Sequence, residues 1–152
     1  MRRHLLLILT ALSVMSFAWP ANAQMSQSKC ISVEGDGSQT LRTWGKGRNR
    51  ADAIEQAKKN AVYDVLFNGV SQGNEGYNLR PLITEVNARE RYREYFDIFF
   101  KDRGVYLKYV SMADRRLLSN QKKKSSAQVS YEITVRVLIP ELRQRLKDDG
   151  IL

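Results

Sequence analysis

The clearest secondary-structure signal of the chain lies at residues 129–139, Val-Ser-Tyr-Glu-Ile-Thr-Val-Arg-Val-Leu-Ile. Apolar side chains recur at every second position from Val129 to Ile139, and polar or charged ones fill the alternate positions as far as Arg136. Such alternation is typical of a strand with one buried and one solvated face. It indicates an antiparallel sheet, because parallel strands are usually buried on both faces. We expect this strand to span residues 127–139.

Two shorter strands are expected near the start of the chain. Residues 31–34 alternate apolar and polar, and residues 39–44 again have strand-like composition. The intervening Asp36-Gly37 favours a hairpin turn, because both central residues of such a turn need positive φ. Gly45-Lys46-Gly47 is expected to end the second strand. A further strand is expected over residues 105–112.

The first helix is predicted over residues 50–68. Asn49 can cap its start, and Asp52 in the first turn favours the helix dipole. Asn68-Gly69 is a stop signal. The apolar residues form one stripe, and two of them are alanines, which would let the helix lie close against a sheet. The stripe comprises Ile54, Ala57, Ala61, Val62, Val65 and Leu66.

Two more helices are expected. The longer one is predicted over residues 85–102, capped by Thr84, and a short last helix begins at Pro140 and ends at Gly150. Helical spacing connects the apolar residues of the longer one, which are Ala88, Tyr92, Tyr95, Phe96 and Phe99.

The order of these elements lacks the strand–helix–strand alternation of a parallel sheet. It predicts a two-layer α+β fold with an antiparallel sheet of about four strands. We expect the two main helices on one face of the sheet, together with the short C-terminal helix. Residues 31–152 are expected to form a single domain after a flexible start at residues 24–30.

Residues 1–23 have the layout of a cleaved secretory signal. A basic start precedes an apolar run from Leu5 to Trp19, and Ala21-Asn22-Ala23 offers a cleavage site. The run falls short of the roughly 20 apolar residues that span a bilayer, so we expect no transmembrane segment in the mature chain. The mature protein is expected to be periplasmic or exported and soluble after cleavage. Peripheral association with the outer membrane stays open.

The residues available for chemistry are few. His4, the one histidine of the chain, leaves with the signal, so we expect no histidine-dependent catalysis, no metal site and no cofactor. Cys30 is the one cysteine, which rules out an internal disulfide. Gln27-Ser28-Lys29 before it does not fit a lipidation signal. A small buried side chain in the first strand is the favoured interpretation of Cys30, with an intermolecular disulfide as the alternative.

The net charge of +9 favours anionic partners, and nucleic acid is disfavoured for an exported protein. Two basic segments are candidate anion sites, although either can be ordinary solvated surface. One is the glycine-containing turn into the first helix, and the other is a hairpin tip expected within residues 113–126. Their candidate residues are Lys46, Arg48 and Arg50 in the turn, and Arg115, Arg116, Lys122, Lys123 and Lys124 in the tip.

The end of the second main helix is a candidate partner contact. Its aromatic stripe has the spacing of core residues, but Ile98 and Phe100 fall off that stripe and widen the apolar face. The residues of this candidate patch are Tyr95, Ile98, Phe99 and Phe100.

Three features together resemble the amino-terminal domain of flagellar assembly protein T and related small bacterial envelope proteins. They are Val33-Glu34-Gly35-Asp36-Gly37, the alanine-spaced helix over residues 51–61, and a late hairpin ending in Val-x-Val. The resemblance implies an exported, non-catalytic α+β module that docks onto an envelope assembly. The chain departs from that family in lacking a lipidation signal and a following middle domain. Residues 92–100 have no counterpart, and no site residues carry over.

Two functions are therefore expected, and an enzyme is disfavoured. The preferred one is a periplasmic interaction module that joins a cell-envelope protein complex through the apolar patch or a sheet edge. The alternative is a binding protein for an anionic envelope component, such as a glycolipid or an acidic polymer, that uses the basic hairpin tip.

Overall fold

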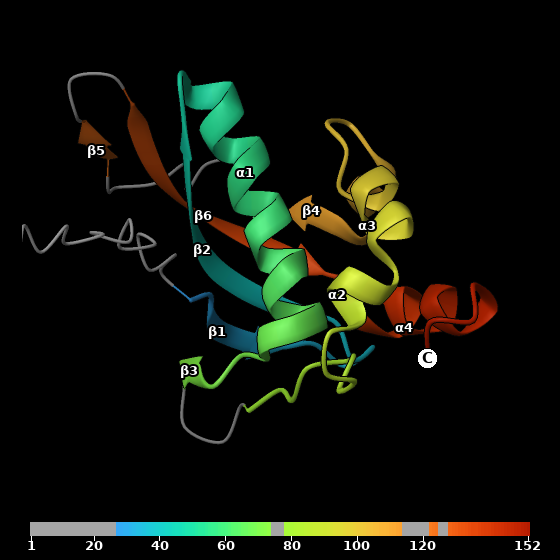
Figure 1. Cartoon of the computed structure of the whole chain (residues 1–152). Coiled ribbons are helices and arrows are strands. Elements are labelled where there is room, and N and C mark those ends of the chain that lie inside the picture. The colour runs from blue at the N-terminus through green and yellow to red at the C-terminus, as the bar shows by residue number, and fades with distance from the viewer. Residues whose placement is uncertain (1–26, 74–77, 114–121, 125–127) are drawn as a thin grey trace, which may run out of the picture.

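The structure is a computed structural model that describes residues 27–73, 78–113, 122–124 and 128–152 (Figure 1). The predicted leader at residues 1–23 lies outside the described residues. A mixed sheet and several helices make up the described part, and the sheet does not close into a barrel.

The sheet confirms the predicted fold class. Its strands follow the order β3-β1-β2-β6-β4, and β5 also pairs with β6. The neighbouring strands β1, β2, β6 and β4 pair antiparallel, whereas the very short β3 pairs in parallel with β1. The strand limits are Lys29–Val33 for β1, Gln39–Gly47 for β2, Gln72–Gly73 for β3, Val110–Met112 for β4, Lys122–Lys124 for β5 and Val129–Val137 for β6.

Strand β6 lies between β2 and β4 in the sheet, and its alternating sequence turns one face toward the core. It pairs with β2 over the full length of both strands, from Gln39 opposite Val137 to Gly47 opposite Val129. Ile133, Val135 and Val137 are buried in the core. The strand ends two residues before the predicted limit, because Ile139 already belongs to the last helix.

Helix α1, Arg50–Tyr63, lies across the sheet (Figure 1) and continues into a single wider turn, η1, Asp64–Asn68. The Asn49 side chain accepts a hydrogen bond from the Asp52 backbone N–H at 3.0 Å, so the predicted cap is confirmed. Gly69 then adopts a φ of 73°, a left-handed conformation that ends the helix. The predicted limits of this helix are correct.

Two glycines of β2 let α1 pack directly on the strand. A Cβ at Gly45 would lie 2.0 Å from the Ala53 carbonyl oxygen, and one at Gly47 would lie 2.4 Å from the Ala53 backbone nitrogen. The facing helix residues Ala53, Ala57 and Ala61 are fully buried. The helix and the strand therefore approach so closely that the strand has room for no side chain at these two positions and the helix has room only for alanine.

The prediction of one helix over residues 85–102 is wrong. Helices α2, Ala88–Arg91, and α3, Arg93–Phe99, are separated at Tyr92, whose φ and ψ of −105° and 34° leave the helical range. The first of them begins after Asn87, which has a left-handed φ of 63°, and Thr84 is not its cap.

The late start of α2 follows from the segment before it. The backbone N–H groups of Leu82 and Ile83 donate to the carbonyl oxygens of Val65 and Leu66, which fixes this segment against the end of the first helix. The chain must then turn at Asn87 before a helix can begin. Contacts far apart in the sequence thus override the local helical pattern.

The strand predicted over residues 105–112 is largely wrong. Val105–Tyr109 forms a 3₁₀ helix, η2, and only Val110–Met112 pairs with β6. Tyr106 is fully buried, and its hydroxyl donates to Glu55 of α1 at 3.1 Å. Burying this ring beneath the first helix requires a turn rather than an extended chain.

Helix α4, Ile139–Asp148, confirms the predicted last helix, with Pro140 in its first turn. Leu142 and Leu146 are fully buried. Gly150 follows with a φ of 69°. This helix lies beside α3 at one end of the sheet (Figure 1), and the Tyr95 hydroxyl donates to Asp149 at 2.6 Å.

The ordered chain begins earlier than the expected domain start at residue 31. Strand β1 begins at Lys29, and the Ser28 backbone N–H donates to the Asp64 carboxylate at 2.8 Å. Cys30 is buried with a free thiol, as favoured from the sequence, and burial raises its pKa. The register shifts between Cys30 and Ser32, so Val33 ends up 39% exposed despite its apolar side chain.

Candidate functional site

The cations of the predicted turn site do not converge. Lys46 lies within β2 and is exposed, whereas Arg48 pairs with Asp52 at 3.2 Å. The Arg50 guanidinium lies over the Tyr131 ring, 5.7 Å from its centroid. Asn49 already accepts from the first amides of the helix. The neighbouring glycines serve the packing of strand and helix, so the anion site proposed for this turn is not formed.

The structure describes only part of the predicted basic hairpin tip. Lys122, Lys123 and Lys124 form strand β5, paired with β6 from Lys122 opposite Tyr131 to Lys124 opposite Val129. The three lysines thus lie at an edge of the sheet, where lysine discourages pairing with other chains. Arg115 and Arg116 lie outside the described residues.

The predicted partner patch is mostly core. Phe99 is only 2% exposed, and Phe100 is half-buried against Phe96 and Phe99. The Tyr95 hydroxyl is held by its hydrogen bond to Asp149. Burial raises the pKa of Tyr95, and the hydrogen bond to Asp149 raises it further. Ile98 differs from the other three, because 67% of it is exposed.

A second aromatic group lies where α1 ends. The Tyr63 ring contacts the Phe67 ring at a centroid distance of 4.8 Å and the Phe100 ring at 6.1 Å. Tyr63 is exposed and the other two are half-buried. This group closes the core between the first helix and α3 and leaves a modest aromatic surface.

The face of the sheet opposite α1 carries unpaired cations; we call it the outer face. Alternation in β2 places Leu41 and the fully buried Thr43 toward the helix, and Arg42 and Lys46 on the outer face. Lys29 of β1 is the register partner of Arg42. These three cations are exposed, and none of them pairs with an acidic side chain within the described part of the chain.

Other charges of the outer face are already engaged. Arg136 of β6 donates to the Asp36 carboxylate and to the Ser38 hydroxyl, both at 2.6 Å. Hydrogen bonds from the Ser38 hydroxyl and backbone N–H lower the pKa of Asp36, and Arg136 lowers it further. Ser32 and Thr40 likewise lower the pKa of Glu34 by hydrogen bonding. These groups are hydrogen-bonded to one another at the β1–β2 turn, so we do not assign them to ligand binding.

The middle of the outer face combines an acid with an aromatic ring. Glu132 of β6 is the register partner of the half-buried Trp44 of β2. The next outer-face residues of β6 on either side of Glu132 are Ser130 and Thr134. Ser130 is the register partner of Lys46, and Thr134 is the register partner of Arg42. The cations of β2 therefore flank an acidic residue.

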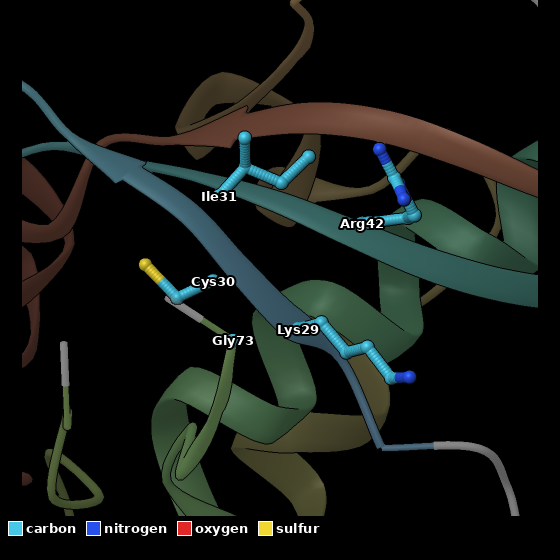
Figure 2. Close-up of a pocket in the computed structure, with 5 residues that line it drawn as sticks. All are labelled: Lys29, Cys30, Ile31, Arg42 and Gly73. Carbon is cyan, nitrogen blue, oxygen red and sulfur yellow. The ribbon is translucent and has the colours of Figure 1, made fainter. Parts of the chain in front are cut away.

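A shallow cavity of about 240 Å³ lies at the bulge of β1. Its lining residues are Lys29, Cys30, Ile31, Arg42 and Gly73. Figure 2 shows Ile31 and Arg42 extending to the same side while the Lys29 side chain leads away from them. The two cations do not converge, so the cavity has no built anion site.

Metal-binding clusters and membrane-spanning helices are two further features that bear on function. These residues include no cluster of three histidine, cysteine or acidic side chains able to hold a metal ion. Within the same residues, no helix is long and apolar enough to cross a membrane.

No family model, no curated protein and no solved structure matches the chain. The resemblance to the flagellar assembly domain therefore stays a prediction, and the argument about function rests on the residues of this chain.

The outer face includes two cations that the sequence did not single out as candidates, Lys29 and Arg42. A signal for the second was present, because Arg42, Trp44 and Lys46 alternate with apolar or small residues. It was obscured by the glycines around Lys46, which suggested a turn rather than a continuing strand.

Proposed function

We propose that the protein is an exported, non-catalytic binding protein of the cell envelope, and that the outer face of its sheet binds an anionic envelope component. The observation that carries the proposal is a group of three exposed cations, Lys29, Arg42 and Lys46, that pair with no acidic side chain among the described residues. Export is inferred from the leader-like residues 1–23.

Stability does not account for this arrangement. Lys29 and Arg42 are direct register partners, and like charges opposite each other in an antiparallel pair are destabilising. An anionic ligand held by Arg42 and Lys46, which share the outer face of β2, would give these two charges an opposite partner. Binding of this kind should weaken as ionic strength rises, because exposed charges are screened by salt.

The test is a triple variant, Lys29→Gln with Arg42→Gln and Lys46→Gln. Each cation near an anionic surface contributes about 1 kcal/mol, so binding to vesicles with anionic lipid or to an acidic polymer should weaken by a factor on the order of 100. The matched control removes three exposed cations on the helical side, Lys108, Arg143 and Lys147. Equal losses in both variants would show that only net charge matters and would overturn the site.

The export part has its own measurement. Intact mass of the native protein should show an amino terminus at Gln24 and an unmodified Cys30. A retained Met1 or a lipid on Cys30 would contradict it.

Docking onto an envelope protein complex is the second candidate function. It is favoured by Ile98, an exposed apolar side chain on α3, and by Val86, which is 83% exposed just before α2. Ile98→Glu should abolish co-purification of a partner without unfolding the chain. Val33→Glu, on the β1–β2 hairpin, is the control. Phe100→Glu is not suitable, since that ring packs against the core.

A further inference from the structure

The outer face carries two cationic positions along β2 that lie too far apart for a single anion to contact both. This inference rests on the proposed function and concerns the same face. Register places its residues in three rows across the strands. One row holds Arg42 and Thr134; the middle row holds Trp44 and Glu132; the third holds Lys46 and Ser130.

The spacing of the rows follows from strand geometry. Arg42 and Lys46 are four residues apart in one extended strand, which at roughly 3.3 Å per residue separates their Cα atoms by about 13 Å. One phosphate or carboxylate cannot contact both cations across that distance. Glu132, in the row between them, repels an anion placed there.

We infer that the ligand is a linear acidic polysaccharide that lies along β2, with anionic groups recurring at about the spacing of the two cationic rows. Each repeat would place a charge at Arg42 and the next at Lys46. The uncharged part of the repeat would pass over the middle row at Trp44 and Glu132. Linking two weak contacts on one chain raises the affinity well above that of either contact alone.

Nucleic acid fits this pattern poorly. Its charges follow one another much more densely, at about 3.4 Å along each strand of a duplex. Such a ligand would bring phosphates over Glu132 whenever it reached both cationic rows. The middle row thus selects against uniformly dense polyanions.

The experiment uses the full mature protein and hyaluronan oligosaccharides, which carry one carboxylate in each disaccharide, from disaccharide to decasaccharide. Affinity should rise at least tenfold at the length that first bridges both rows and then change little. Lys46→Gln should remove this step, so that the longest oligosaccharides bind no more tightly than the shortest ones. Lys147→Gln, an exposed cation of α4, should keep the step.

Two comparison ligands separate the possible failures. Vesicles with anionic lipid present single head groups, and oligo-dT presents a dense polyanion. If long oligosaccharides bind no better than short ones while vesicles bind well, the inference falls and the proposed function stands. If no anionic ligand binds, both fall. Glu132→Gln should improve binding of oligo-dT more than binding of hyaluronan, and an equal improvement would contradict the assigned selectivity of the middle row.

Discussion

The two faces of strand β2 differ in what their residues do. On the inner face, Gly45 and Gly47 have no side chain, so the backbone of the first helix lies directly against the strand. On the outer face, Arg42 and Lys46 are exposed and no acidic side chain in the described residues pairs with them. One face therefore specifies packing, and the other carries exposed charge, to which we assign the proposed ligand.

This difference explains why residues 45–50 suggest an anion-binding turn when their position on the two faces of the strand is ignored. Glycines and cations at residues 45–50 suggest one anion-binding turn, because glycine loops often expose backbone amides to anions. Alternation separates them, since the glycines face the helix and Lys46 faces away. The predictions below test whether the two faces are as independent as the structure indicates.

The largest expected effect comes from a charge placed on the inner face. Val135→Asp should abolish cooperative unfolding, because it buries an unpaired carboxylate at a position with no exposed surface, at a cost on the order of 4 kcal/mol or more. Thr134→Asp places the same charge on the outer face, opposite Arg42, and should be tolerated. Thermal melts decide the matter; equally mild changes would mean that the faces are wrongly assigned.

The contact of the first helix with β2 should be nearly as sensitive. Gly45→Ala would bring a Cβ to 2.0 Å from the Ala53 carbonyl oxygen, so the free energy of unfolding should fall by about 3 kcal/mol or more. The control is Gly35→Ala, whose Cβ would meet no atom within 4 Å. Urea denaturation of both variants should show a large loss only at Gly45. A normal stability for Gly45→Ala would refute the close approach.

A smaller effect of opposite sign is expected at Thr43. Its hydroxyl is buried on the inner face without a hydrogen-bond partner, so Thr43→Val should raise the free energy of unfolding by about 1 kcal/mol. On the outer face, the Thr40 hydroxyl donates to Glu34 at 3.0 Å, and Thr40→Val should not stabilise the protein. Chemical denaturation would distinguish the two, and a gain at both positions would show that the substitution acts through strand propensity alone.

The smallest expected effect is the dependence of stability on pH at the β1–β2 turn. The pKa of Asp36 in the folded chain is lowered from its ordinary value of 3.8, so the carboxylate stabilises the fold above that value. This contribution is lost as pH falls through the lowered pKa. Melting temperatures measured between neutral and acidic pH should therefore converge for the wild type and Asp36→Asn at low pH. Curves that stay parallel would show that Asp36 contributes nothing.

The parts of the fold that the sequence predicted are those in which local pattern and tertiary contacts agree. Strand β6 alternates without interruption, and its buried positions are those with apolar side chains. Helix α1 has its own cap at Asn49 and its own stop at Gly69. In each case, the signals that set the limits lie within the element itself.

The errors have a common cause in contacts between distant segments. Val105–Tyr109 is rich in residues that favour strands, but it forms a 3₁₀ helix in which the Tyr106 hydroxyl donates to Glu55, 51 positions away in the sequence. No local pattern contains that information. The same limit applies in part to the candidate site, because alternation places Arg42 and Lys46 on one face of a strand but does not show which strands lie beside it. For Lys122–Lys124, only the pairing with β6 shows that they form an edge strand and not a tip.

The pairing of β2 with β6 has a consequence for how the chain folds. It joins Gln39 to Val137, so the strand that completes the middle of the sheet is among the last parts of the chain to be made. The hairpin of β1 and β2 and the first helix involve neighbouring segments and can form early, whereas closing the long loop to β6 is slow. A chain that crosses a membrane from its amino terminus would meanwhile expose one edge of β2, which makes the interval before β6 arrives the time of greatest risk of aggregation.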